Sequence, residues 1–188
     1  RHEDFPVENI TWWSAIFFAN ELSKKHGFDP AYDLSGIKFD AIDILEMHKT
    51  PLFERDIFAV AARGALSSKS SNTSPKINSA GANIYLAKGY RLPTEVEQEY
   101  LLRAAGQANT LFHFGDDESL LGNYAWYIYN SGGRTHPVGE KKPLFINGRP
   151  IFDVLGNVRE WGHDWERPNY GGVDRHDNRW GSLRVTRG

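Results

Sequence analysis

The chain of 188 residues contains no cysteine, and this absence excludes disulfide bonds, zinc sites built on thiolates and every mechanism that needs a thiol. Cysteine-free proteins occur in every compartment, so the cellular location stays open on this ground. The chain also lacks a surplus of positive charge, because its formal net charge is −2 at pH 7 and no cluster of Lys and Arg stands out. Proteins that bind phosphate backbones carry such a cluster, so nucleic acid is not expected as a partner.

Long apolar stretches are missing as well. No run approaches the roughly 18 to 20 apolar residues that a membrane-crossing helix needs, so no transmembrane segment is expected. The first residues, Arg1-His2-Glu3-Asp4, do not have the composition of a signal peptide. The chain does contain 40% hydrophobic and 13% aromatic residues, which is enough for one packed core but scarcely for two. We therefore expect a single domain over residues 1–188.

A helix is predicted from about Trp12 to Lys25. Thr11 is a good N-cap residue for it, and Gly27 is placed to end it. The residues that recur at near-helical spacing are Trp13, Ile16, Phe17 and Asn20. Residues 37–65 mix helical periodicity with a break at Pro51 and predict one or two short helices.

Residues 67–83 are rich in Ser, Asn, Lys and Gly and contain almost no large apolar group. Such a composition buries too little surface to offset the entropy of ordering, so a mobile surface loop is expected there.

A second helix is predicted from about Glu95 to Ala105. Thr94 followed three residues later by Glu97 forms a capping box, in which each side chain satisfies a free amide at the helix start. Glu95 and Glu97 also invite interpretation as a pair of catalytic carboxylates, but residues two apart on a helix point in different directions, which favours capping and solvation. The apolar positions expected to be buried on one face are Val96, Tyr100, Leu101 and Ala104.

Residues 111–188 are dense in Gly, Asn, Asp and aromatic residues, with short extended pieces near 112–114, 137–138 and 183–186.

Four blocks of the chain carry a resemblance to a known family: "PVENITWWSAIFFANELSKKHGFDPAYDLSG", "GYRLPTEVE", "LGNYAWYIYNSGGRTHPVGEKKP" and "GNVREW". They resemble the formylglycine-generating enzyme family, also called sulfatase-modifying factors. The variable proteins of diversity-generating retroelements share this scaffold and offer a second resemblance.

The resemblance implies an α+β protein with an elaborated C-type-lectin-like fold, which has few helices, short antiparallel strands and much irregular structure. The chain departs from the family at Gln98 and at Arg159, where the family carries Trp, and at Gly162-His163 after the final Trp of "GNVREW". It also resembles a domain without its N-terminal hairpin and without the segment that follows "RVTRG", so we expect part of a longer gene product.

In the family, the segment that follows this last block holds the copper-binding, redox-active cysteine pair. Copper(I) prefers soft thiolate ligands, and the chain has none to offer. No copper is therefore expected in this chain, and oxidation of a substrate cysteine is not expected from it.

The resemblance further implies structural calcium, at Asn157, Val158 and Glu160 and at Asn123 with the carbonyl of Tyr124. Amide, carboxylate and carbonyl oxygens are the ligands that calcium prefers. The alternative is a turn in which Asn157 adopts a left-handed conformation and Glu160 forms a salt bridge, with Arg159 available as its cation.

Four histidines fall in the turn-rich half: His113, His136, His163 and His176. Their spacing matches no iron or zinc motif, and Ser131 near His136 lacks the strand, turn and helix that surround a nucleophile. His163 with Asp164 is typical of a hydrogen-bonded surface pair.

We expect a noncatalytic recognition domain whose loops, 124–133 and 166–180, bind a protein or glycan ligand. Trp12, Trp13 and Trp161 belong to family blocks and are expected in the core. The residues predicted to line the binding surface are Tyr124, Trp126, Trp165, Asn169, Arg179 and Trp180.

Two alternatives stay open beside this one. The first is a truncated formylglycine-generating oxidase that modifies a cysteine of a sulfatase-type substrate, with its own cysteines beyond Gly188. The second is a structural subunit of a larger assembly. The resemblance implies an extracytoplasmic or cell-surface location.

Overall fold

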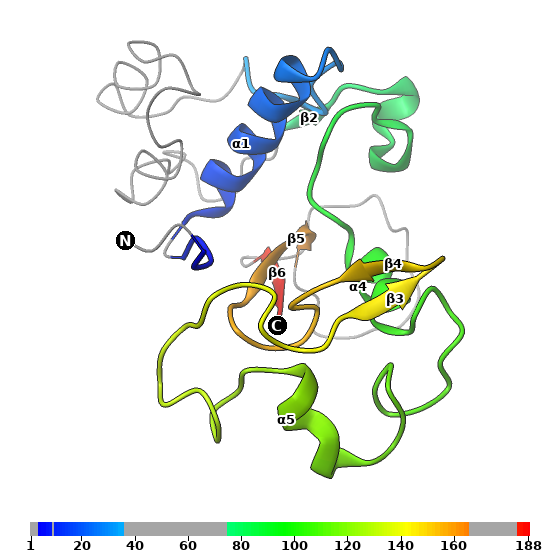
Figure 1. Cartoon of the computed structure of the whole chain (residues 1–188). Helices are drawn as coiled ribbons and strands as arrows, with labels where there is room; N and C mark the ends of the chain where they lie inside the picture. The colour runs from blue at the N-terminus through cyan, green and yellow to red at the C-terminus, as the bar shows by residue number, and fades with distance from the viewer. Residues whose placement is uncertain (1–3, 9, 36–74, 166–183) are drawn as a thin grey trace. The chain divides into compact units, whose positions relative to one another are not determined.

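In the computed structural model, four stretches of the chain are described (Figure 1): residues 4–8, 10–35, 75–165 and 184–188. The chain divides into two compact units. The first comprises Arg1–Glu8, Pro93–Gly162 and Thr186–Gly188, and the second comprises Asn9–Leu92 and His163–Val185. The expectation of a single domain stays a prediction. The helices predicted within 37–65 lie outside the described residues, as do His176, Asn169, Arg179 and Trp180.

Helix α1, at Trp12–Lys25, begins and ends where the sequence predicts. At its start, Thr11 Oγ1 accepts a hydrogen bond from the backbone N–H of Ser14 at 3.1 Å. At its end, Gly27 has a φ of +74°, which an L side chain rarely adopts. This left-handed step lets the N–H of Phe28 donate to the carbonyl of Ser23 at 2.9 Å, so that the last turn has its carbonyls satisfied.

The buried face of α1 is formed by Trp12, Ser14, Ile16, Ala19, Asn20 and Ser23, while Trp13 and Phe17 are half-buried. Asn20 joins the helix to strand β1 (Tyr32–Asp33) through two bonds to one residue. Its Nδ2 donates to the carbonyl of Tyr32 at 2.7 Å, and its Oδ1 accepts from the N–H of Tyr32 at 3.0 Å. The helix is therefore followed by a tight turn and an extended tyrosine.

Strand β2 (Lys76–Ile77) pairs antiparallel with β1, with Tyr32 opposite Ile77. The 3-10 helix η1 (Ala80–Ala82) follows it. Both elements fall inside the segment 67–83, whose composition predicted no regular structure. The pairing with β1 supplies order that the local sequence does not encode.

The chain then returns to the end of α1 through η2 (Ile84–Leu86). A Cβ on Gly89 would lie 2.2 Å from the carbonyl oxygen of Asp29 and 2.6 Å from Ser23 Oγ, so only glycine fits there. The next N–H, that of Tyr90, donates to Ser23 Oγ at 2.7 Å.

The core of the second unit is built around Arg184. Its guanidinium lies between two indole rings, 3.7 Å from the centroid of Trp12 and 3.8 Å from that of Trp165. Its Nη1 donates to the carbonyl of His163 at 2.6 Å. Burial lowers the pKa of Arg184 to about 9. The guanidinium is therefore still protonated at neutral pH.

This arrangement corrects two expectations. Trp165 is only 8% exposed and His163 only 6%, so neither lies at the surface where we placed them. Trp165 is buried because it packs against Arg184, and His163 because its Nδ1 lies 3.3 Å from the hydroxyl of Tyr32. That hydroxyl also accepts from the N–H of Leu92 at 3.1 Å. Burial raises the pKa of Tyr32 to about 12.

In the first unit, helix α4 (Glu95–Leu102) starts with the predicted capping box. Thr94 Oγ1 accepts from the N–H of Glu97 at 3.2 Å, and Glu97 Oε2 accepts from the N–H of Thr94 at 2.9 Å. The helix stops earlier than predicted because Ala104 and Ala105 have φ angles of +50° and +57°.

The buried face of α4 differs from the predicted one. Val96 and Tyr100 are 51% and 59% exposed, whereas Thr94 and Gln98 are 2% and 6% exposed. The side of the helix that is buried therefore carries Gln98 in place of Val96 and Tyr100. The expectation of an apolar buried face at Val96 and Tyr100 is therefore wrong.

The remaining elements are short: η3 (Glu118–Leu120), α5 (Leu121–Tyr124), β3 (Leu144–Ile146), β4 (Arg149–Ile151), β5 (Glu160–Trp165) and β6 (Arg184–Arg187). Strands β3 and β4 form an antiparallel hairpin, and β5 pairs with β6. Few helices and short strands joined by irregular segments make this the predicted α+β class. Within the described ranges, no helix combines the length and the hydropathy that crossing a membrane requires.

Candidate recognition site

The segment that follows α5 forms a tight turn at residues 127–131, which we call the exposed turn. The N–H groups of Asn130 and Ser131 donate to the carbonyl of Tyr127 at 3.0 and 2.8 Å. The side chain of Asn130 closes the turn from within, since its Oδ1 accepts from the N–H of Tyr127 at 2.7 Å. Its Nδ2 donates to the carbonyl of Ala125 at 2.9 Å. Asn130 therefore satisfies one backbone group at the start of the turn and another just before it.

Two large apolar side chains stand on this turn. Ile128 is 82% exposed and Tyr129 is 89% exposed, which are the highest values among the large hydrophobic residues of the described ranges. The ring of Tyr129 meets that of Tyr127 edge-on, with centroids 5.9 Å apart. An ordered turn thus holds two apolar groups in water. Figure 1 shows the chain between α5 and β3 as a long irregular excursion without helix or strand.

Trp126 supports the base of the exposed turn. Its indole stacks on the ring of His136, with centroids 3.7 Å apart and planes 11° from parallel. The ammonium of Lys141 lies 3.6 Å from the indole centroid and donates to the carbonyl of Gly122 at 2.6 Å. The indole nitrogen is buried and has no hydrogen-bond partner among the described residues. Trp126, predicted to line the binding surface, is half-buried in this stack.

A second stack orders the residues around Tyr124. The rings of Phe112, Phe114 and Tyr124 lie nearly parallel, with centroids 4.9 and 4.1 Å apart. The Lys142 ammonium lies 5.6 Å from the Tyr124 centroid. His113 meets Phe114 and Tyr124 edge-on, and burial lowers the pKa of His113. Tyr124 is half-buried, so it helps to hold the segment as much as it presents a surface.

The "GNVREW" turn contacts the backbone of Trp126 through Asn157. Asn157 has a φ of +59°, which is the left-handed conformation expected in the alternative to calcium. Its N–H donates to the carbonyl of Trp126 at 2.8 Å. Its side chain bonds the backbone of His136 twice, since Oδ1 accepts from the N–H and Nδ2 donates to the carbonyl, both at 3.0 Å. Both polar atoms of the Asn157 amide therefore have a partner within the fold.

The other predicted calcium ligands include Asn123, Val158 and Glu160, and each has a different environment. The carbonyl of Asn123 accepts from the N–H of Lys142 at 2.9 Å. The carbonyl oxygen of Val158 lies under Gly188, where a Cβ would come within 2.5 Å of it. Loss of water and the negative charge of Asp153 raise the pKa of Glu160. Among the described residues neither Glu160 nor Arg159 forms an ion pair, so the salt bridge of the alternative is absent there.

The side-chain oxygen that a calcium ion would require of Asn157 already accepts a hydrogen bond. Within the described ranges, no three His, Asp or Glu side chains gather in a way that could hold a metal ion. Calcium at these residues stays a prediction.

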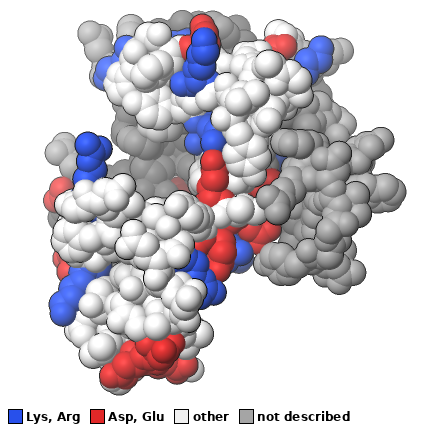
Figure 2. All heavy atoms as spheres, turned by 90° about the vertical axis from the view of Figure 1, so that its right-hand side faces the viewer, with Lys and Arg blue, Asp and Glu red and all other residues white. Residues whose placement is uncertain are grey.

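An acidic run, Asp116, Asp117 and Glu118, is exposed at the start of η3, and Figure 2 shows acidic side chains gathered at the lower end of the visible face. The aspartates of this run have local partners. Asp117 caps η3, and hydrogen bonds from Ser119 lower the pKa of its carboxyl. Asp116 Oδ1 accepts from the N–H of Leu111 at 2.6 Å. The run therefore shapes its own segment and is not assigned a ligand.

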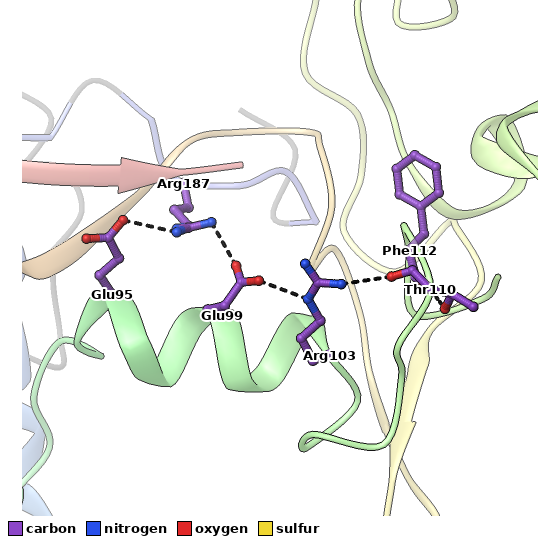
Figure 3. Close-up of polar contacts among 6 residues, drawn as sticks. All are labelled: Glu95, Glu99, Arg103, Thr110, Phe112 and Arg187. Carbon is purple, nitrogen blue, oxygen red and sulfur yellow. Dashed lines mark hydrogen bonds and ion pairs between the residues drawn. The ribbon is translucent and has the colours of Figure 1, made fainter. Parts of the chain in front are cut away.

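Four charged side chains link the end of β6 to α4 (Figure 3). Arg187 donates to Glu95 and to Glu99, both at 3.0 Å, and Arg103 donates to the other oxygen of Glu99 at 2.9 Å. Arg103 Nη1 continues to the carbonyl of Thr110 at 2.8 Å. Glu95 therefore binds an arginine while Glu97 caps the helix, and the two do not form a catalytic pair.

Of the predicted surface, Tyr124 and Trp126 lie beside the exposed turn, and Trp165 lies in the core of the other unit. Asn169, Arg179 and Trp180 lie outside the described residues, so the predicted surface as a whole stays a prediction. Sequence patterns did not lead us to single out Ile128, Tyr129 or Lys141. A signal was present at the first two, because an apolar pair directly before Asn-Ser-Gly-Gly is typical of side chains carried on a turn.

Comparison with known proteins identifies the scaffold. Residues 1–188 match the sulfatase-modifying factor enzyme 1-like domain. Chaperone protein LppX of Paenibacillus barcinonensis is 28% identical over 184 residues, which are 88% of this chain and 54% of that protein. Formylglycine-generating enzyme of Streptomyces coelicolor is 35% identical over 117 residues, which are 53% of this chain and 35% of the enzyme. The mouse formylglycine-generating enzyme is 36% identical over 88 residues, which are 41% of this chain and 23% of that enzyme.

Among solved structures, Treponema denticola variable protein 1 superposes with a TM-score of 0.62 and 29% sequence identity, covering 100% of this chain and 60% of that one. This likeness confirms the C-type-lectin-like fold. The chain spans about half the length of the chaperone protein and about a third or less of the two enzymes. The chain belongs to the sulfatase-modifying factor family, and it does so without a single cysteine.

Proposed function

We propose that this chain is a noncatalytic protein-binding domain on a formylglycine-generating-enzyme-like scaffold, and that the exposed turn is its contact with a protein ligand. One observation carries the proposal: Ile128 and Tyr129, 82% and 89% exposed, stand on a turn whose backbone is fixed by hydrogen bonds. A flexible loop would also expose apolar groups, but it would not hold them in one orientation.

Ordered exposure of this kind favours recognition. Tyrosine is enriched among the residues that dominate protein interfaces, because it offers a large area with few rotatable bonds. A turn that is already ordered loses little conformational entropy on binding. Ile128 and Tyr129 project from the exposed turn into solvent, so the ligand must supply the pocket that receives them.

The noncatalytic part of the proposal is supported by composition. The copper chemistry implied by the family resemblance needs thiolate ligands, and the chain contains none. The relative named a chaperone protein and the structural neighbour named a variable protein are not named as enzymes, which is in keeping with a binding role.

Site-specific cross-linking tests the proposal. A photoreactive phenylalanine analogue replaces Tyr129, and the labelled chain is exposed to proteins of the source organism. We expect one discrete cross-linked species. Excess unlabelled chain should suppress it by competition, whereas excess unlabelled Ile128→Ser/Tyr129→Ser double variant should not. The matched control places the analogue at Phe145, which is 60% exposed on β3. Equal yields from both positions, or equal competition by the double variant, would refute the role of the turn.

The truncated-oxidase alternative draws support from the identity to two formylglycine-generating enzymes. It is tested separately, by incubating the natural protein, including whatever follows Gly188, with copper(I) and a cysteine-containing sulfatase peptide. We expect no formylglycine product, as judged by peptide mass. Product formed by the natural protein would overturn the noncatalytic assignment.

A further inference from the structure

The segment between Trp126 and His136 carries the exposed turn, and both of its ends meet one residue, Asn157. The N–H of Asn157 donates to the carbonyl of Trp126 at 2.8 Å, and its side chain bonds the N–H and the carbonyl of His136, each at 3.0 Å. We propose that Asn157 is the positioning residue of the exposed turn. It closes segment 126–136 into a loop and so fixes the direction in which the two apolar side chains point.

The chemistry of these bonds requires an amide. The backbone of His136 presents a donor and an acceptor, and only a side chain with both an acceptor and a donor satisfies the two together. An aspartate at residue 157 would place a carboxylate against the carbonyl of His136. A glycine would accept the φ of +59° but would leave both backbone groups of His136 without partners.

The preceding residue places Asn157 within reach. A Cβ on Gly156 would lie 2.2 Å from the carbonyl oxygen and 3.0 Å from the carbonyl carbon of Trp126, so the two strands of chain touch backbone to backbone. Trp126 and Gly156 also form an isolated β-bridge. This close approach brings the N–H of Asn157 onto the carbonyl of Trp126.

His136 carries the effect to the turn itself. Its Nε2 lies 2.8 Å from the carbonyl of Ser131, the last residue of the exposed turn. Its ring stacks on Trp126, the residue before the turn. Asn157 fixes the backbone of His136, and His136 in turn contacts the chain on both sides of Ile128 and Tyr129.

A loop whose ends are held together has fewer conformations to lose when it binds. The inference therefore rests on the proposed function only in taking the exposed turn as the contact surface. The order of the turn is a property of the free chain and is measured without any ligand.

Amide hydrogen exchange of the full chain tests the inference, with Asn157→Asp compared to the unaltered protein. The N–H groups of Tyr127, Asn130 and Ser131 report on the turn, because each donates a hydrogen bond within it. We expect their exchange to become at least about tenfold faster, because the hydrogen bond to the carbonyl of His136 is lost and a carboxylate is placed against that carbonyl, while amides of α1 are unaffected. The matched control is Asn147→Asp.

Asn147 is suited to this control. It is also left-handed, with a φ of +51°, and it is exposed in the turn between β3 and β4. Its side chain makes no hydrogen bond within the described part of the chain. We expect Asn147→Asp to leave the exchange of the exposed turn unchanged.

Lowering the pH should restore the protection of the turn in Asn157→Asp, which a general loss of structure would not allow. A protonated aspartic acid has an O–H donor and a carbonyl acceptor, as the amide does. Protection of the turn in Asn157→Asp, relative to the unaltered protein, should therefore return as the pH falls through the titration of the new carboxyl. Asn157→Ala should show no such return.

Three results would overturn the inference: unchanged exchange of the turn in Asn157→Asp, a loss of protection spread equally over α1, or the same loss in Asn147→Asp. The cross-linking experiment adds a functional reading, in which Asn157→Asp lowers the yield from residue 129 although the contact side chains are intact. If the unaltered chain cross-links to nothing, the proposed function fails while the exchange data still decide the role of Asn157.

Discussion

Helix α1 and the segment 112–142 reach their order by opposite routes. The helix is set by neighbours, since a threonine caps its start, a glycine ends it and its bonds run between residues a few positions apart. The irregular segment is held by partners distant in sequence, such as Asn157 for His136 and Gly122 for Lys141. The candidate site therefore owes its shape to a few individual contacts and not to a repeating pattern.

Such dependence makes the segment sensitive to single changes. In a helix, the loss of one contact is spread over neighbours that repeat it. In segment 112–142, each hydrogen bond or stacked ring has a separate position and no equivalent nearby. Substitutions should therefore have larger effects where a single contact has no equivalent nearby, and three of them test this expectation.

The largest effect is expected for Gly156→Ala. The new Cβ would overlap the carbonyl oxygen of Trp126, and the φ of +77° would add strain. We expect a loss of about 3 kcal/mol or more in the free energy of unfolding, measured by urea denaturation, because backbone and not a movable side chain must yield.

Gly132→Ala is the control for this substitution. Gly132 has a φ of +63°, but a Cβ added there would meet no atom within 4 Å. Only the backbone penalty of about 1–2 kcal/mol should appear there. Equal losses in the two variants would show that close contact at Gly156 contributes nothing, and the contrast between the two regions would lose its main support.

Sequence patterns predicted the parts that local rules determine. The cap of α1, the glycine after it and the capping box at Thr94 all follow from residues within one turn of each other. The family and its fold followed from the "GYRLPTEVE" and "GNVREW" blocks, which match known patterns over several positions.

Distant partners explain where prediction failed. The exposed side of α4 could not be foreseen, because Arg187, which binds Glu95 and Glu99, lies 92 and 88 residues away in sequence. Trp165 was placed on the surface for the same reason, since the guanidinium that covers it comes from Arg184. The exposed turn lies within the predicted loop 124–133, but the predicted contact residue Trp126 packs beneath it on His136, and the exposed side chains are those of Ile128 and Tyr129.

Tyr32→Phe should have a smaller effect that depends on pH, and it probes the core beneath α1. At pH 7 the N–H of Leu92 loses its acceptor, which should lower the free energy of unfolding by about 1–2 kcal/mol. Burial raises the pKa of Tyr32 from 10.0 to about 12 in the folded protein. Between these values the unfolded chain has lost the proton and the folded chain has kept it.

Ionisation therefore favours unfolding between pH 10 and 12, and the stability that Tyr32 contributes is lost as the pH rises through that window. Urea denaturation at a series of pH values should show the difference between the unaltered protein and Tyr32→Phe shrinking there. Tyr129→Phe is the control, because Tyr129 is 89% exposed and its curve should stay parallel to that of the unaltered protein. A constant difference for Tyr32→Phe would contradict the buried, neutral phenol.

The smallest effect, and the only gain, is expected for Gln98→Met. Gln98 is 6% exposed, and neither its Oε1 nor its Nε2 has a hydrogen-bond partner among the described residues. An unsatisfied buried amide is destabilising, so a thioether of similar length should raise the free energy of unfolding by about 1 kcal/mol. Gln107→Met, at an exposed position, should leave the urea midpoint unchanged. A loss of stability in Gln98→Met would mean that an internal water satisfies the amide. This face of α4 would then be ordered by specific polar contacts and not by apolar packing, as the segment 112–142 is.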